Sequence, residues 1–207
     1  MPQITAIKPQ EKRKNRFNVY LDGQFALAIS NELLVSEGLK VGQELSFEKR
    51  EELVAKDRLG KAQEQIYRFL SYRPRSEKEI YDYLGKKKLK DEEKEKIIKK
   101  LKEEKLIDDL EFARWFLEQR QTFRPKGSYA LRQELRQKGI GEKIIDQVLP
   151  NKEEELSLAK KALVKAEKKY ASFLGREKKE KLMAYLRRRG FSWEAVKKAV
   201  DEREENR

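Results

Sequence analysis

The chain of 207 residues contains no histidine and no cysteine. Without histidine, a catalytic triad with an imidazole base is impossible, and the commonest metal ligand is missing. Without cysteine, there are no disulfide bonds and no thiolate zinc sites, which fits a reducing compartment. We therefore predict a cytoplasmic protein that needs no metal ion and no cofactor.

Two sequence patterns are also missing. No apolar run approaches the roughly 18 residues of a membrane span, and the first residues lack the apolar core of a signal peptide. There is no GxxxxGK[ST] loop, so nucleotide hydrolysis of that class is not expected. These absences favour a binding or regulatory protein without a membrane partner.

One acidic group invites a catalytic interpretation. Asp108, Asp109 and Glu111 stand close together, and nucleases hold Mg²⁺ with carboxylates. Adjacent residues of a helix point about 100° apart, however, so the two aspartates do not converge on one ion. A helix-capping role accounts for them better, and we predict that the chain is not an enzyme.

The composition is highly charged and basic. Charged residues make up 42% of the chain and apolar residues 38%, with a net charge of +13. Residues 1–60 contribute only +1 to that charge, whereas residues 61–107 contribute +5, residues 108–150 +1 and residues 151–207 +6. Thin cores between stacked helices would give this composition, and a basic surface attracts nucleic acid or acidic protein.

Residues 106–148 predict three short helices in succession. Asp108 is placed as an N-cap with Glu111 completing a capping box, and Ile107 with Phe112 forms a hydrophobic staple. The sequence Arg124-Pro125-Lys126-Gly127 ends the first helix. The second helix is expected over 128–138, with Leu131 and Leu135 on its apolar face, and it ends at Gly139, where a positive φ is accessible. Ile140 then leads into the third helix.

The same pattern recurs every 51 residues. Leu84, Leu135 and Leu186 share this spacing, as do Ile80, Leu131 and Leu182, and Leu89, Ile140 and Phe191. Lys87, Lys138 and Arg189 follow the same register. The first helices do not align without gaps, so the period holds over the second and third helices. Three copies of a helical unit are therefore predicted.

The first 45 residues predict a small antiparallel sheet with a short helix. Strands are expected over 4–7, ended by Pro9, and over 16–21 and 25–29, the last two joined by an Asp22-Gly23 turn. The basic stretch 8–16 is interpreted as a solvated hairpin loop, with a contact to phosphate as the alternative. A helix from Ser46 follows, which Gly60 is expected to weaken or hinge.

The predicted fold is mainly α-helical, with tandem three-helix repeats in an elongated array after the small β region and short helix. We expect the β region over 1–45, a linking helix over 46–60, and repeats over 61–107, 108–150 and 151–207.

Residues 61–149 resemble the RecX family, bacterial modulators of the RecA recombinase. The resemblance rests on Arg73-Pro74-Arg75-Ser76-Glu77-Lys78-Glu79, in which Ser76 and Glu79 also form a capping box, and on Ile107-Asp108-Asp109-Leu110-Glu111-Phe112-Ala113. It continues with Arg120, Pro125-Lys126-Gly127, Leu131-Arg132-Gln133-Glu134-Leu135 and Lys138-Gly139-Ile140. The third repeat matches less closely, and the first sixty residues resemble the strand-rich extension of some members.

The family resemblance implies a function in the regulation of recombination, DNA repair and the SOS response. A member would bind RecA filaments on single-stranded DNA as a monomer and restrain ATP hydrolysis and strand exchange by occupying the filament groove. The resemblance leaves open whether the chain contacts RecA, single-stranded DNA directly, or DNA through RecA. It also leaves open whether the chain caps filament ends or coats the groove.

The candidate contact residues are basic side chains near helix ends and on polar helix faces. They are Arg73, Arg75, Arg120, Arg124, Lys126, Arg132, Arg136, Lys138, Arg187, Arg188 and Arg189. A solvated helix face is the alternative for Arg132, Arg136 and Lys138. Tyr72 and Phe123 are candidates for exposed aromatic contacts, whereas Trp115 and Phe116 are expected in the core.

Two rival functions use the same charges. A helix-turn-helix regulator would place its second or third helices in the DNA major groove. The third helices, however, begin with Asp91-Glu92-Glu93 and Gly141-Glu142-Lys143, and acidic starts repel phosphate. A scaffold that contacts only proteins is the other rival.

Overall fold

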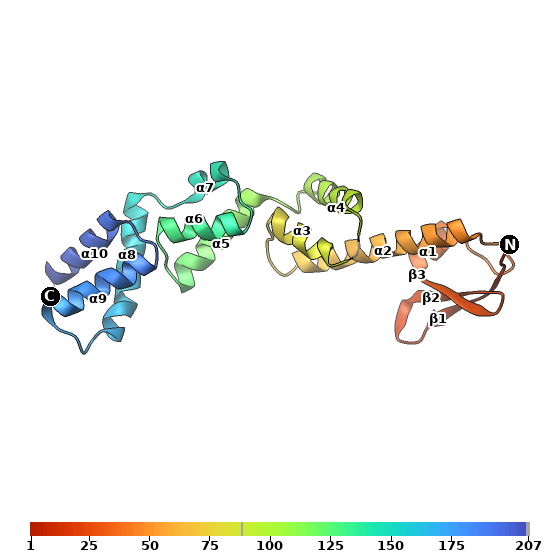
Figure 1. Cartoon of the computed structure of the whole chain (residues 1–207), viewed down its shortest axis with the longest axis horizontal. Coiled ribbons are helices and arrows are strands. Elements are labelled where there is room, and N and C mark those ends of the chain that lie inside the picture. Colours follow the sequence, from red (N-terminus) through yellow and green to blue (C-terminus); the bar gives the residue numbers. More distant parts are fainter. Residues whose placement is uncertain (88, 206–207) are drawn as a thin grey trace. The chain divides into compact units, whose positions relative to one another are not determined.

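The computed structural model describes residues 1–87 and 89–205 (Figure 1). The chain divides into two compact units, Met1–Ser71 with Leu84–Ile97 and Tyr72–Tyr83 with Ile98–Arg207. The described residues are mainly helical and follow a small antiparallel sheet, as the sequence predicts. None of the described helices is long and apolar enough to cross a membrane.

The first unit contains a three-stranded antiparallel sheet in the order β1-β2-β3. The strands are β1 (Ile4–Gln10), β2 (Arg13–Leu21) and β3 (Gln24–Ser30), followed by α1 (Asn31–Ser36) and α2 (Phe47–Leu70). Asp22 and Gly23 have φ values of 47° and 82°, as a two-residue hairpin turn requires. Val19, Ile29 and Leu53 are buried between sheet and helix, so the sheet and α2 share one core.

The predicted end of the first strand is wrong, and of the two effects predicted for Gly60, weakening or hinging α2, the hinge is contradicted. The first strand continues through Pro9, which is tolerated because β1 lies at the sheet edge and needs no ladder donor there. The basic stretch 8–16 is therefore mostly strand. Helix α2 continues through Gly60, where an added Cβ would meet nothing within 4 Å. A single glycine costs a helix about 1 kcal/mol, and the buried Leu53 and Ile66 stabilise the helix on either side of it.

A buried ion pair joins the sheet to α2. Arg16, predicted to lie at the edge of a loop, donates to both carboxylate oxygens of Asp57 at 3.1 and 2.9 Å and to the carbonyl of Ala28. Asp57 also accepts from the backbone N–H of Ser30. Burial would raise the pKa of Asp57, but the hydrogen bonds of Arg16 and Lys61 hold this pKa below its ordinary value.

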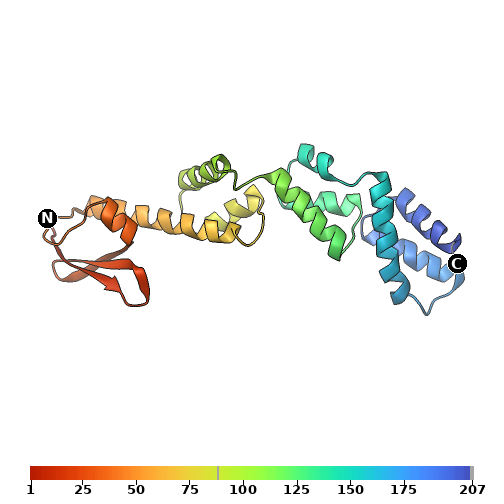
Figure 2. The ribbon, with the colours of Figure 1, turned by 180° about the vertical axis from the view of Figure 1, so that it is seen from behind.

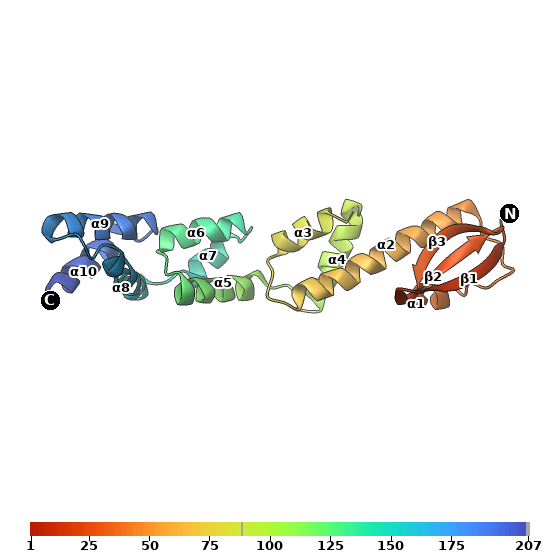
Figure 3. The same ribbon diagram turned by 90° about the horizontal axis from the view of Figure 1, so that it is seen from below.

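The second unit includes α3 (Glu77–Gly85) as far as Tyr83 and the end of α4 (Asp91–Glu103), and then two complete three-helix groups (Figures 2 and 3). The first group comprises α5 (Asp109–Phe123), α6 (Ser128–Gln137) and α7 (Glu142–Val148). The second comprises α8 (Lys152–Lys169), α9 (Gly175–Arg188) and α10 (Trp193–Glu205).

Each complete repeat has its own apolar core. In the second repeat Phe112, Leu131 and Leu135 are fully buried, together with Ile140 and Ile145. Their counterparts in the third repeat, Leu182, Leu186 and Phe191, are buried with small side chains from α8 and α10. The 51-residue register therefore marks core positions, which confirms the prediction of repeated helical units.

Candidate functional site

In the second and third repeats, the end of the second helix contacts the start of the second helix of the preceding repeat. Gly139 and Gly190, 51 residues apart, follow α6 and α9 with φ values of 82° and 78°. A Cβ on Gly139 would lie 2.6 Å from the Cβ of Lys78, and one on Gly190 would lie 2.5 Å from the backbone nitrogen of Ala130. Both glycines therefore serve two purposes: they end a helix, as predicted for Gly139, and they permit a close contact between repeats.

A carboxylate from the next repeat caps the second helix at both junctions. Asp109 of α5 accepts from the backbone N–H of Glu77, the first residue of α3, at 2.9 Å. Glu155 of α8 accepts from the N–H of Ser128, the first residue of α6, at 2.8 Å. Negative charge is favourable at a helix N-terminus, where the first N–H groups lack partners within the helix.

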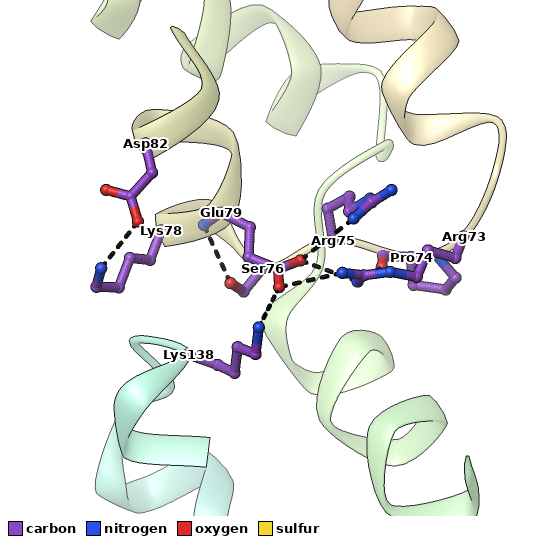
Figure 4. Close-up of polar contacts among 8 residues, drawn as sticks. All are labelled: Arg73, Pro74, Arg75, Ser76, Lys78, Glu79, Asp82 and Lys138. Atoms are coloured by element: carbon purple, nitrogen blue, oxygen red, sulfur yellow. Dashed lines mark hydrogen bonds and ion pairs between the residues drawn. The ribbon is translucent and has the colours of Figure 1, made fainter. Parts of the chain in front are cut away.

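Figure 4 shows the charged cluster at the first junction. The guanidinium of Arg73 donates to both carboxylate oxygens of Glu79 at 2.9 and 3.1 Å, and Lys138 donates to one of them at 2.6 Å. Arg75 lies 3.9 Å from the same carboxylate. Burial would raise the pKa of Glu79, but the hydrogen bonds of Arg73 and Lys138 hold it below its ordinary value. Three candidate cations therefore surround one internal carboxylate.

Within the second repeat, the Glu134 carboxylate binds two more of the candidate cations. Glu134 accepts from Arg120 at 2.7 Å and from Lys126. Burial opposes ionisation of Glu134, but the two cations outweigh it and lower its pKa. The guanidinium of Arg120 also stacks on Phe116, 4.8 Å from the ring centre. These contacts tie α5 to α6 and the loop between them.

The candidate cations on the polar face of α6 are also paired internally. Arg132 donates to Glu142 at 2.6 Å and to Asp146 at 2.7 Å, and Arg136 donates to Glu142. The hydrogen bond from Arg136 is the main cause of the lowered pKa of Glu142; burial opposes it, and the hydrogen bond from Arg132 adds to the lowering. The acidic start of the third helix therefore binds the second helix of its own repeat.

The Arg187-Arg188-Arg189 cluster divides into two kinds of side chain. Arg189 donates to the carbonyl of Pro125 at 3.0 Å, and its own carbonyl accepts from the N–H of Gly127, so it belongs to the second junction. Arg187 lies over the exposed Trp193 ring at 6.0 Å, and Arg188 donates to the hydroxyl of Tyr170 at 3.4 Å. Arg187 and Arg188 are exposed at the end of α9.

Seven of the eleven candidate cations are bound to carboxylates of the same chain. They are Arg73, Arg75, Arg120, Lys126, Arg132, Arg136 and Lys138. Within the described residues, Arg124, Arg187, Arg188 and Arg189 form no ion pair, and of these only Arg189 is partly buried. Among the eleven candidates, the positive charge left for a partner therefore lies at Arg124, Arg187 and Arg188.

Asp108 and Asp109 have different roles. Asp108 caps α5 by accepting from the N–H groups of Leu110 and Glu111 at 2.8 and 3.2 Å, as predicted. Asp109 caps α3 of the preceding repeat, and its burial raises its pKa. A complete capping box occurs elsewhere, at Asn151 and Glu154, where it was not predicted. The described residues contain no group of three or more His, Cys, Asp or Glu that could hold a metal ion.

Sequence reasoning missed the acidic residues that organise this part of the chain. Glu79 was assigned to a capping box with Ser76; Ser76 does accept from the N–H of Glu79, but the Glu79 carboxylate binds Arg73 and Lys138. Asp109 and Glu155 lie 46 residues apart, outside the 51-residue register. A separate alignment of the first helices would have brought these two acids together.

Comparisons with known proteins agree with the repeated architecture. Models of the RecX family match four consecutive segments: the regulatory protein RecX N-terminal domain at 2–46, and the first, second and third three-helix domains at 62–101, 108–149 and 153–200. Regulatory protein RecX of Bacillus pumilus is 35% identical over 204 residues, covering 98% of this chain and 78% of the relative. This chain belongs to the RecX family.

Other RecX proteins extend the comparison. The Clostridium tetani protein is 33% identical over 205 residues, covering 96% of this chain and 93% of the relative. A crystal structure of a regulatory protein RecX superposes with a TM-score of 0.70 at 33% identity, over 97% of this chain and all of the other. RecX from Lactobacillus salivarius shares the fold over 71% of this chain, with a TM-score of 0.64. The relatives are named regulatory proteins. The fold shared with the RecX crystal structure extends over both units of this chain.

Proposed function

We propose that this chain binds RecA filaments on single-stranded DNA and restrains their ATP hydrolysis and strand exchange by occupying the filament groove. It would act in the cytoplasm as a monomer and form or break no covalent bond. Membership of a family of regulatory proteins supports this proposal, as does the family resemblance of the motifs around Arg73 and Asp108.

The observation that carries the proposal is the distribution of unpaired positive charge. Most candidate cations stabilise the chain itself, which leaves the exposed Arg124, Arg187 and Arg188 for an anionic partner. Such charges accelerate encounter with an acidic surface and contribute less to the final affinity than buried contacts do.

The helix-turn-helix alternative has less support. The N-terminus of α7 carries Glu142, whose carboxylate is held by Arg132 and Arg136 at the place where a recognition helix would meet phosphate. The alternative is retained as an outcome of the experiment.

The test is the rate of RecA ATP hydrolysis on single-stranded DNA, with and without this protein. In parallel, the protein is titrated with naked single-stranded and duplex DNA over a range of salt concentrations. We expect inhibition of RecA. Tight, sequence-selective duplex binding with RecA unaffected would favour the helix-turn-helix regulator.

A charge-reversal variant separates partner contact from folding. Arg187→Glu with Arg188→Glu should weaken inhibition, while Arg189 is kept because its side chain bonds Pro125. The matched control is Lys197→Glu with Lys198→Glu, an equal charge change at exposed positions of α10 in the same repeat. If both variants inhibit RecA equally weakly, net charge alone determines binding. If both inhibit as well as the wild type, neither pair of residues contributes to binding.

A further inference from the structure

The 51-residue register includes one set of large apolar side chains that do not belong to any core. Tyr72, Phe123 and Leu174 are spaced 51 residues apart, and their exposed fractions are 70%, 65% and 80%. The leucines of the same register, Leu84, Leu135 and Leu186, are completely buried. Each repeat therefore keeps a large apolar side chain at the same place and leaves it in water.

This exposure is unusual within the chain. Apart from Met1, the five most exposed large apolar side chains among the described residues include all three of these positions, with Val35 and Tyr129 as the other two. The register counterparts of Tyr129 are the polar Lys78 and Glu180, so Tyr129 does not recur. Burial of a large apolar side chain is favourable, so leaving three of them exposed forgoes stability that a contact surface can recover.

The first two positions lie close to the end of a first helix. Phe123 is the last residue of α5, Tyr72 follows the end of α2 at Leu70 by two residues, and in both cases the second helix begins five residues later, at Glu77 and Ser128. In the third repeat Arg176 occupies the register position of Pro74 and Pro125. Helix α9 begins there at Gly175, directly after Leu174. Leu174 remains exposed although the surrounding loop is shorter.

Positive charge lies beside Phe123 and Leu174, although the lysine near Leu174, Lys181, also pairs with Glu177 at 3.5 Å. Arg124 follows Phe123, is exposed and has no ion-pair partner among the described residues, and Lys165 donates to the carbonyl of Phe123 at 3.2 Å. In the third repeat the Lys181 ammonium lies 4.1 Å from the centre of the Phe173 ring, next to Leu174. The surface therefore fits a partner that offers an apolar pocket bordered by acidic groups.

A protein fits this pattern better than a nucleic acid. Base stacking needs a π face, which Tyr72 and Phe123 have and Leu174 lacks. Arg73, next to Tyr72, is held by Glu79 and is poorly placed to bind phosphate. The property that all three positions share is exposed apolar area, and protein pockets accept tyrosine, phenylalanine and leucine alike.

We propose that Tyr72, Phe123 and Leu174 are equivalent docking residues that enter apolar pockets on successive, identical subunits of an acidic protein polymer. A polymer offers the same pocket at regular intervals, as equivalent repeats require. The inference rests on the proposed function in one respect, because the RecA filament is the polymer used to test it.

The experiment compares three proteins: wild type, the triple variant Tyr72→Ala/Phe123→Ala/Leu174→Ala, and Tyr129→Ala as the matched control. Tyr129 is 69% exposed and lies outside the register. Each protein is titrated by fluorescence anisotropy against RecA filaments on oligo(dT) with a non-hydrolysable ATP analogue, and separately against naked oligo(dT). Circular dichroism melting should be unchanged because the removed side chains are mostly exposed. If the triple variant melts early, Phe123→Ala alone replaces it.

We expect the triple variant to lose at least about tenfold in affinity for filaments, and Phe123→Ala alone at least about threefold. Binding to naked oligo(dT) and all properties of Tyr129→Ala should stay as in wild type. An equal loss on naked oligo(dT) would overturn the inference in favour of base stacking, and an equal loss in Tyr129→Ala or no loss at all would also overturn it. If the wild type itself does not bind filaments, the proposed function fails and the inference fails with it.

Discussion

Replacing Glu155 with alanine should destabilise the second unit by about 2–4 kcal/mol. The carboxylate is buried and accepts from the N–H of Ser128 at 2.8 Å, the hydroxyl of Ser192 at 2.8 Å and the N–H of Ser192 at 3.4 Å. A hydrogen bond to a charged group contributes about 1.5–3 kcal/mol, and the third contact is long. Relief of the cost of burying a carboxylate offsets part of the loss, which gives the stated range.

Urea unfolding followed by tryptophan fluorescence measures the stability of the second unit. Both tryptophans, Trp115 and Trp193, belong to the second unit, as Glu155 does. Glu155→Gln should lose about half as much, because its amide oxygen still accepts a hydrogen bond.

The control is Glu153→Ala on the exposed side of the first turn of α8. It removes only a favourable interaction with the helix dipole and should cost less than about 1 kcal/mol. Equal losses in the Glu155 and Glu153 variants would refute the capping of α6 by a buried carboxylate.

Three further outcomes follow from burial, backbone conformation and charge. Leu135→Ala should cost about 2–5 kcal/mol because the side chain is fully buried, and an unchanged circular dichroism melt would refute its core position. Gly139→Ala and Gly190→Ala should each cost more than about 1 kcal/mol, since both have positive φ. Gly190→Ala should cost more in urea unfolding, because its Cβ would meet backbone atoms of Ala130, whereas that of Gly139 would meet side-chain atoms of Lys78. Glu79→Gln should be less stable than wild type at neutral pH. The lowered pKa of Glu79 gives stability that is present above its ordinary value of 4.5 and lost as the pH falls through the folded-state pKa, so the two denaturation curves should converge in acid.

The sequence predicts the repeat architecture well because its signals are local. The spacing of Leu131 and Leu135 marks one helix face, Asp108 marks a helix start, and Gly139 marks a helix end. Each of these signals spans only a few residues, so it can be interpreted without knowledge of the tertiary structure. Recurrence at a fixed offset then shows that the local units are copies.

The candidate contact residues could not be sorted from the sequence, because their partners are distant. Lys138 binds Glu79, 59 residues away, and Arg16 binds Asp57, 41 residues away. A basic residue on a polar helix face has the same pattern whether it binds a partner protein or an acid of its own chain. The exposed Phe123, in contrast, could be anticipated from its place at a helix end among arginines.

At both junctions of the second unit, the end of one second helix contacts the start of the preceding second helix, but the bonds that hold this contact differ. The first joins Lys138 to Glu79 through partly buried charges, whereas Ala130 occupies the register position of Glu79 at the second. There the backbone replaces the missing carboxylate: the N–H of Gly127 donates to the carbonyl of Arg189 at 3.0 Å. Raising the salt concentration to about 1 M shortens the Debye length to about 3 Å and weakens charge pairs more than backbone hydrogen bonds. Hydrogen exchange at Glu77 should therefore quicken with salt while exchange at Gly127 stays constant. If both amides respond equally, charge does not distinguish the junctions, and the ion pairs around Glu79 contribute little to holding the repeats together.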